Sequence, residues 1–278
     1  MNTLRVRNLK LFSCLLLLLI PFIRLDAQCF KGNTSVGPSE YLAYDISYNL
    51  GPTWSNIALV TLVTTQEMLG GKEVLHMKIN GKTYPMYDHL FKVRDSYESW
   101  INPQTWETIK FLQYTVHNKN TILLSQYFYP AMLNYSFTYK LNNKAVDKGQ
   151  VTVENCIRDM VSAAYFPRTL DLEKLLPGTV IPVSTVFYNN PVSLQMVAAG
   201  KGIIETGDGK KYICSKFTIK TTSKIYLVKE GSDIVVWLTA DNNKVPVLIE
   251  AELIIGSVKF HIKEAKGLRN PNSALLTK

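Results

Sequence analysis

Residues 56–80 read NIALVTLVTTQEMLGGKEVLHMKIN, and this stretch decides the fold class. Its first half, Asn56 to Glu67, is rich in Val, Thr, Ile and Leu, which favour strands. Gly70-Gly71 is a dipeptide typical of a two-residue hairpin turn, and Lys72 to Asn80 supplies a second strand-like run. The stretch therefore predicts two antiparallel strands joined by a tight turn.

The same signals continue on both sides of this hairpin. Apolar or aromatic residues occupy every second position from Leu42 to Tyr48, the pattern of a half-buried strand. Turn signals recur at 118–120, 207–209 and 241–243. Further strand candidates are 91–100, 105–116, 121–129, 135–139, 180–188, 192–204, 211–222, 234–239, 245–253 and 257–264. We predict a mostly β protein whose meandering antiparallel sheet is rolled into a barrel-like or sandwich domain.

One segment, residues 155–176, interrupts the strands. Apolar residues recur at helical spacing from Ile157 to Tyr165. Asn155 is predicted to cap this helix, and Pro167 to end it, because proline has no backbone donor. A second short helix is predicted from Asp171 to Leu176. One or two short helices near 155–176 would plug the end of a barrel or cover an open sheet edge.

The N-terminal residues predict export. Basic residues precede an apolar run from Leu11 to Ile23, and the small residue Ala27 follows. This is the pattern of a secretory signal peptide over residues 1–27, and the run is shorter than the ~20 residues of a membrane-spanning helix. Cys29 leaves a lipid anchor open as an alternative. Gln28 stands where a lipoprotein signal has a small residue, so soluble export to the periplasm or outer envelope is preferred.

The rest of the chain has the size and charge of one exported domain. We assign residues 28–268 to a single β-rich domain and expect a disordered tail at 269–278. The 278-residue chain has 31 Lys and Arg against 22 Asp and Glu, a formal charge of +9, but it has no long basic run. This argues against a nucleic-acid partner and allows a weak preference for anionic lipid or glycan.

The cysteines carry little information on function. Once the signal peptide has left, Cys29, Cys156 and Cys214 remain, which allows one disulfide and one free thiol. Cys156 lies in an apolar context and is predicted to be a small buried hydrophobe.

No metal or cofactor motif is present in the sequence. The four histidines are far apart, and none shows the paired spacing of a zinc site. There is no Gly-x-Ser-x-Gly elbow and no glycine-rich phosphate loop. We therefore expect neither a metal site nor a cofactor.

The loop at 83–88, TYPMYD, is rich in aromatic rings. Together with nearby tryptophans it could line a cleft that holds a lipid tail or stacks on a sugar. The alternative is that these rings fill the core of the barrel. The ligand-binding candidates are Trp54, Tyr84, Tyr87, Asp88, Arg94 and Trp100.

The same region concentrates carboxylates. Asp88, Asp95 and Glu98 lie close to Arg94 in the sequence, and two converging carboxylates could hydrolyse a glycan. On a regular strand, however, Arg94 and Asp95 point to opposite faces. Carboxylates near arginines in β proteins mostly form ion pairs. An enzyme is therefore the less favoured reading.

Four segments of the chain form a familiar set: 41–44 with 51–54, 83–88 with 91–98, 158–165, and 236–250 with its Trp237 and Pro246, closing at 256–258. Together they resemble domain-of-unknown-function family 3108, exported proteins of Gram-negative bacteria. The resemblance implies a β-rich domain of the periplasm or outer envelope and supplies no catalytic residues to transfer.

These observations favour an envelope binding module for a lipid, a lipid-linked glycan or an envelope polymer. A structural or partner-binding envelope protein, pairing through a sheet edge, is the alternative. A carboxylate-dependent hydrolase ranks third.

Overall fold

The computed structural model describes residues 32–49, 51–221 and 228–276. The predicted signal peptide at 1–27 and the alternative anchor at Cys29 lie outside these residues.

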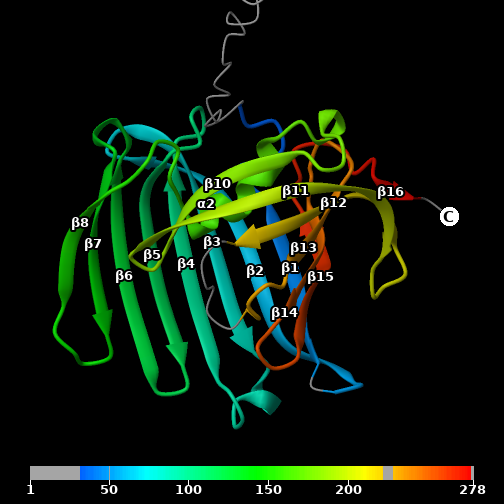
Figure 1. Cartoon of the computed structure of the whole chain (residues 1–278), viewed down its shortest axis with the longest axis horizontal. Helices are drawn as coiled ribbons and strands as arrows, with labels where there is room; N and C mark the ends of the chain where they lie inside the picture. The colour runs from blue at the N-terminus through cyan, green and yellow to red at the C-terminus, as the bar shows by residue number, and fades with distance from the viewer. Residues whose placement is uncertain (1–31, 50, 222–227, 277–278) are drawn as a thin grey trace, which may run out of the picture.

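One large sheet makes up most of the molecule (Figure 1). Its first eight strands are β1 (Tyr41–Asn49), β2 (Trp54–Leu69), β3 (Lys72–Thr83), β4 (Val93–Ile101), β5 (Thr108–His117), β6 (Asn120–Tyr129), β7 (Asn134–Leu141) and β8 (Asp147–Thr152). The other eight are β9 (Arg158–Asp159), β10 (Val180–Phe187), β11 (Asn190–Glu205), β12 (Lys211–Thr221), β13 (Ile234–Thr239), β14 (Pro246–Glu252), β15 (Ser257–Lys266) and β16 (Leu275–Leu276). The main path is β8-β7-β6-β5-β4-β3-β2-β1-β15-β14-β13-β12-β11-β10-β9, and β16 pairs with β12.

The pairing confirms the predicted meander. Every neighbouring pair on the path is antiparallel except β9 with β10, which is parallel. The β2–β3 turn is Gly70-Gly71, and both glycines have positive φ (57° and 78°), the conformation that a tight hairpin turn requires. The sheet curls as a barrel wall does but is not closed, because β8 and β9 end the path. The predicted mostly β, barrel-like fold class is confirmed.

The helical segment is shorter than the sequence predicts. It consists of α2 (Met160–Tyr165) and the 3-10 helices η4 (Phe166–Thr169) and η5 (Leu172–Lys174); η2 (Pro85–Tyr87) and η3 (Pro130–Met132) lie elsewhere. The predicted cap, Asn155, is wrong. Asp159 caps α2 instead, since its carboxylate accepts from the backbone N–H groups of Val161 and Ser162. Residues 158–159 are held extended by their pairing with β10, so the helix begins at Met160.

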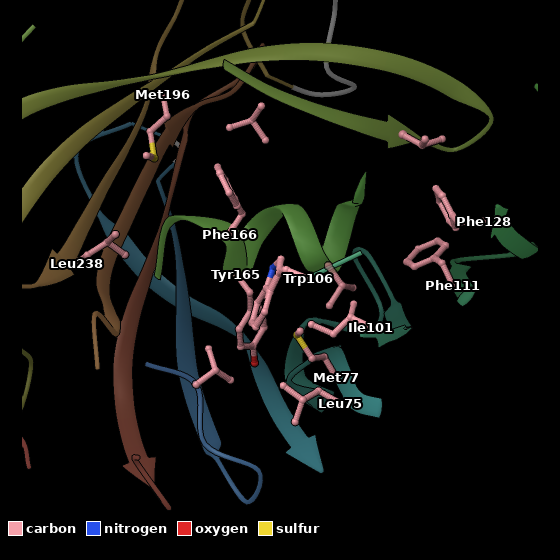
Figure 2. Packing of buried hydrophobic residues seen from close by; sticks show 14 of the residues in the cluster. Leu75, Met77, Ile101, Trp106, Phe111, Phe128, Tyr165, Phe166, Met196 and Leu238 are labelled. Carbon is pink, nitrogen blue, oxygen red and sulfur yellow. The ribbon is translucent and has the colours of Figure 1, made fainter. Parts of the chain in front are cut away.

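The main hydrophobic cluster fills the concave side of the curled sheet (Figure 2). Trp106, Phe111 and Tyr135 are each almost fully buried there, and α2 contributes Tyr165 to the same cluster. The aromatic rings that fill the core are therefore not those of the predicted cleft.

The last residues pack against the rest of the fold, which corrects the expectation of a disordered tail from residue 269. The Asn243 side chain donates to the carbonyls of Asn270 and Pro271 and accepts from the Asn270 N–H. Leu275–Leu276 then pairs with β12 as β16. These backbone and amide contacts order residues 269–276, although their sequence carries no strand pattern.

The two described cysteines also differ from expectation. Cys156 is disulfide-bonded and only half-buried, with a positive φ of 64°, so it is not the small buried hydrophobe that was predicted. Cys214 is the buried free thiol.

Candidate functional site

The outer face of the sheet carries an open groove at β2–β5. Register places Leu59, Lys82 and Arg94 side by side on β2, β3 and β4. The intervening positions, Ile79 and Tyr97 among them, point into the core, so this row faces outward.

A second row, two residues along each strand, completes the groove. It crosses the sheet from Thr61 through Asn80 and Ser96 to Tyr114. The hollow has a volume of about 480 Å³. Its lining is Tyr41, Leu59, Thr61, Asn80, Gly81, Lys82, Arg94, Asp95, Ser96 and Tyr114. We call this hollow the outer-face groove.

Arg94 is held in place at one end of the groove. Its Nη2 lies 2.5 Å from Asp88 Oδ2, and its Nη1 lies 3.0 Å from Asp88 Oδ1 and from Thr83 Oγ1. The hydrogen bonds from Arg94, and then from Thr83, hold the pKa of the Asp88 carboxyl below its usual value. The guanidinium is thus fixed while part of it faces the groove.

Lys82 and Tyr114 are the least restrained groups of the lining. The exposed Lys82 makes no ion pair within the described residues. The Tyr114 ring is 48% exposed across the groove. The Asn80 amide and the Ser96 hydroxyl lie between the two, and the Thr61 hydroxyl lies on the other side of Asn80, on β2. An ammonium, an open ring and neutral donors together suit a polar ligand with an anionic group.

Tyr84 lies beyond the same end of the groove. Its hydroxyl donates to Asp45 Oδ1 at 2.6 Å, and Lys263 Nζ lies 3.0 Å from the same oxygen. Burial, and then the hydrogen bond to Asp45, raise the pKa of the Tyr84 hydroxyl. Tyr84 is therefore a fixed part of the sheet surface.

The predicted ligand-binding residues are only partly brought together. Tyr84, Asp88 and Arg94 lie at one end of the outer-face groove, and half-buried Tyr87 belongs to the neighbouring η2. Trp54 starts β2 at the same end of the sheet, with Lys259 Nζ 4.8 Å from its ring centroid.

Trp100 is separate from the other five. It lies farther along β4, where the His76 ring from β3 stacks on it at 4.3 Å between centroids. Lys110 of β5 lies 4.7 Å from its ring centroid. These neighbours come from the strands on either side of β4, so both faces of the indole are occupied.

The three carboxylates do not converge. Asp88 is engaged by Arg94, and Glu98 by Lys78 and His76 on the outer face. Asp95 belongs to the groove lining, but its carboxylate points to the inner face, where it accepts from the Tyr97 hydroxyl and lies 2.9 Å from His117 Nε2. Burial raises the pKa of the Asp95 carboxyl. The condition for the hydrolase alternative, two carboxylates in one cleft, is not met by these residues.

Sequence reasoning missed Tyr41, Asn80, Lys82 and Tyr114. The position of Lys82 could have been predicted by counting residues outward from the hairpin turn. Once Gly70-Gly71 fixes the β2–β3 turn, Lys82 must pair with Leu59. The side chains across β4 and β5 needed the register of two further strand pairs, which the sequence leaves open.

Two other hollows have lining charges that largely offset one another. One, of about 510 Å³, lies between β15 and the β11–β12 hairpin. Its lysines meet carboxylates, Lys210 with Asp208 and Lys266 with Glu264. The other, of about 340 Å³, is lined by two lysines and three acids. The outer-face groove combines an open ring with an unpaired cation.

No three His, Cys, Asp or Glu side chains in the described part of the chain are grouped so that they could hold a metal ion. No helix among the described residues is long and apolar enough to cross a bilayer.

Comparison with known families identifies the chain. The model of a family described as "Protein of unknown function (DUF3108)" matches residues 43–263. The chain belongs to the DUF3108 family. No curated protein matches it. The match to this DUF3108 protein spans β2–β5 and therefore the whole lining of the outer-face groove except Tyr41.

One solved structure shares its architecture. A β-barrel-like protein of domain of unknown function DUF1849 from Brucella abortus superposes with a TM-score of 0.51 at 9% identity, covering 83% of this chain and 98% of that one. A "putative lipoprotein" from Parabacteroides distasonis aligns over 86% of this chain and 99% of its own, at 9% identity and a TM-score of 0.27. The Brucella structure supports the barrel-like fold alone.

Proposed function

We propose that this DUF3108 protein is an exported envelope protein that binds an acidic glycan, or an envelope polymer with acidic sugars, in the outer-face groove. Export rests on the signal-like sequence at 1–27. Binding rests on one observation above all: unpaired Lys82 and fixed Arg94 lie in register beside the open Tyr114 ring.

The chemistry of the lining favours a sugar acid over a lipid tail. Tyrosine has an apolar body on which a sugar face can pack and a polar tip that can hydrogen-bond. Asn80, Thr61 and Ser96 offer neutral partners for hydroxyl groups, and Lys82 offers a donor for a carboxylate or phosphate. A lipid tail would need an enclosed apolar space, whereas the concave side is occupied by Trp106, the Phe111 ring and their neighbours.

Isothermal titration calorimetry with a defined oligogalacturonate, and with maltohexaose as the neutral comparison, tests this proposal. Binding of the acidic oligomer and weaker binding of the neutral one are expected. Tyr114→Ala and Lys82→Ala should each weaken binding roughly tenfold, which corresponds to about 1.4 kcal/mol.

Tyr127→Ala is the matched control. Tyr127 lies on the outer face of β6 and is 45% exposed, close to the 48% of Tyr114, but it does not line the groove. Equal losses in Tyr114→Ala and Tyr127→Ala would overturn the site. Equal binding of the acidic and neutral oligomers would overturn the ligand class.

A second candidate function follows from the open edge of the sheet. β8 ends the strand path, so one side of its backbone is available for strand addition by an envelope partner. Its exposed Asp147 and Lys148 are of the kind that discourages such pairing, which ranks this candidate below glycan binding.

A further inference from the structure

Bulky apolar side chains project from the loops at one end of the sheet. Met86 is 69% exposed and Leu90 is 71% exposed in the β3–β4 connection. Ile254 is 70% exposed in the β14–β15 turn, and its neighbour Ile255 is similarly open. Trp54 extends the set at the start of β2. Exposed apolar groups that gather in this way mark an interaction surface.

These loops form one rim along the lower edge of Figure 1. The Tyr48 hydroxyl donates to the Ile255 carbonyl at 3.0 Å, which ties the β14–β15 turn to the end of β1. Lys92 and Asn118 bond to each other twice at 2.8 Å, which ties the β3–β4 connection to the β5–β6 turn. The apolar tips are therefore presented by a fixed frame. We call the β3–β4, β5–β6 and β14–β15 connections, together with Trp54 at the start of β2, the loop rim.

Positive charge gathers at the β3–β4 and β5–β6 connections of the loop rim. Lys92 and Lys119 are exposed and make no ion pair within the described residues. Of the nearby acids, Asp88 is engaged by Arg94 and Glu252 by Lys229, whereas exposed Asp233, beside Glu252, makes no ion pair within the described residues. The unpaired ammonium groups of Lys92 and Lys119 thus stand beside the apolar tips of the β3–β4 connection.

We propose that the loop rim seats the protein on the surface of an anionic phospholipid bilayer. Met86, Leu90 and Ile254 would enter the boundary between head groups and acyl chains, while Lys92 and Lys119 face lipid phosphates. Interfacial binding needs this pairing of apolar insertion with electrostatic attraction.

A bilayer fits the rim better than a protein partner does. The apolar side chains stand on separate loops with polar residues such as His89 and Asp88 between them. A protein interface would require a continuous complementary patch, whereas a fluid head-group layer accommodates separate tips. The inference does not depend on glycan binding, because the groove residues Tyr114 and Asn80 lie outside the rim.

Co-sedimentation of the mature chain, beginning at residue 28, with sucrose-loaded vesicles tests the proposal. Vesicles of phosphatidylethanolamine and phosphatidylglycerol at about 3:1 are compared with pure phosphatidylcholine. Binding to the anionic vesicles is expected, and it should weaken as sodium chloride rises from about 50 to about 500 mM, because salt screens the lysines.

Two pairs of substitutions locate the contact. The double variant Met86→Ser/Leu90→Ser should lose at least about tenfold in vesicle affinity, since each apolar side chain removed from the interface costs transfer free energy. The matched control is Met132→Ser/Leu176→Ser. These side chains are 71% and 74% exposed but lie outside the rim, after β6 and before β10. This control should bind as the wild type does.

Lys92→Ala/Lys119→Ala tests the electrostatic part and should reduce the preference for anionic vesicles. The proposal is overturned if the wild type binds neither vesicle, or binds both equally. It is also overturned if the control pair loses as much affinity as the rim pair. Tyr114→Ala should leave vesicle binding unchanged, so a failure of the glycan site and a failure of the rim are distinguishable.

Discussion

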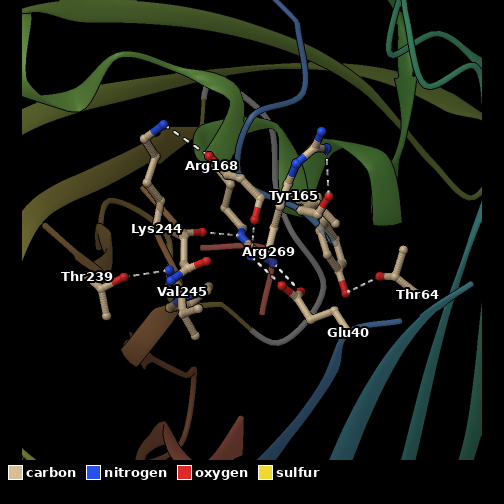
Figure 3. A network of polar contacts seen from close by, with 12 residues as sticks. Glu40, Thr64, Tyr165, Arg168, Thr239, Lys244, Val245 and Arg269 are labelled. Carbon is tan, nitrogen blue, oxygen red and sulfur yellow. Dashed lines mark hydrogen bonds and ion pairs between the residues drawn. The ribbon is translucent and has the colours of Figure 1, made fainter. Parts of the chain in front are cut away.

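Arg168 and Glu40 form a bidentate ion pair in the interior, although 128 residues separate them. Nη1 lies 2.5 Å from Oε1 and Nη2 lies 2.7 Å from Oε2, and both side chains are almost fully buried (Figure 3). The Arg168 Nε–H donates to the Asn243 carbonyl, and Nη2 lies 3.4 Å from the Ser35 carbonyl oxygen. One guanidinium thereby joins the helical segment to the residues before β1 and to the β13–β14 turn.

Removing one partner of this pair should strongly destabilise the protein. Arg168→Met leaves Glu40 buried without its counter-charge, and the expected loss is about 3–5 kcal/mol in the free energy of unfolding. The double variant Glu40→Gln/Arg168→Met should lose less stability than the single variants Glu40→Gln and Arg168→Met lose together. Urea denaturation measures the free energy of unfolding of the two single variants and of the double variant.

The exposed pair Asp171–Lys174 is the control for this experiment. Asp171→Asn should leave the free energy of unfolding almost unchanged, as expected for a solvated ion pair. Similar losses in Arg168→Met and Asp171→Asn would contradict a structural role for the buried pair.

Asp159 is a second buried carboxylate on which several elements converge. Its Oδ2 accepts from the hydroxyls of Ser99, Thr108 and Ser162, each at 2.7 Å, and its Oδ1 caps α2. Asp159→Ala removes the cap and the shared acceptor of these hydroxyls. We expect a loss of about 3 kcal/mol or more, because each buried donor left without a partner costs about 1–3 kcal/mol.

Asn155→Ala is the informative comparison for Asp159→Ala. Asn155 is the residue that helical periodicity selects as the cap, and it is exposed. Its replacement should change the free energy of unfolding by no more than about 0.5 kcal/mol. A thermal melt monitored by circular dichroism separates the two variants, and a larger loss in Asn155→Ala would contradict the observed cap.

The fold was predictable because its information is local. Gly70-Gly71 and the alternation from Leu42 to Tyr48 give strands and turns directly from backbone preference and side-chain period. The cap was not predictable in this way. Asp159 is fixed by pairing with β10 and by hydroxyls from β4 and β5, contacts that periodicity along the helix does not report.

Only part of the candidate site was predictable, because only some of its residues are brought together by local contacts. Asp88 and Arg94 lie six residues apart, so their proximity in the sequence carries into the structure. Trp100 looked equally close, but six residues along an extended strand place it far from Arg94, between His76 and Lys110. Tyr114 enters the groove only through the pairing of β4 with β5.

The Asp88–Arg94 pair predicts a pH dependence of stability. The pKa of the Asp88 carboxyl is lower in the folded chain than its ordinary value, first because Arg94 donates to it. Such a group contributes stability above its unfolded pKa and loses that contribution as the pH falls through its folded pKa. The difference in Tm between the wild type and Asp88→Asn should therefore be constant at neutral pH and should shrink below about pH 4.

Asp147→Asn serves as the control for this pH series. Asp147 is exposed on β8 and makes no ion pair within the described part of the chain. Its Tm difference from the wild type should be small at every pH. A difference for Asp88→Asn that persists undiminished into acid would show that its carboxylate charge does not contribute.

The two described cysteines should differ sharply in reactivity. Burial raises the pKa of the Cys214 thiol to about 12, and a thiol reacts as the thiolate, so Cys214 should resist alkylation in the folded protein. Cys156 is disulfide-bonded and should react only after reduction.

Iodoacetamide labelling followed by peptide mass mapping measures the reactivity of both cysteines. The chain is labelled in three states: native, unfolded, and unfolded with its disulfide reduced. Labelling of Cys156 without reduction would contradict the bond. A peptide linking Cys156 to Cys29 would exclude a lipid on the Cys29 sulfur, because one sulfur atom cannot carry both a disulfide and a thioether bond.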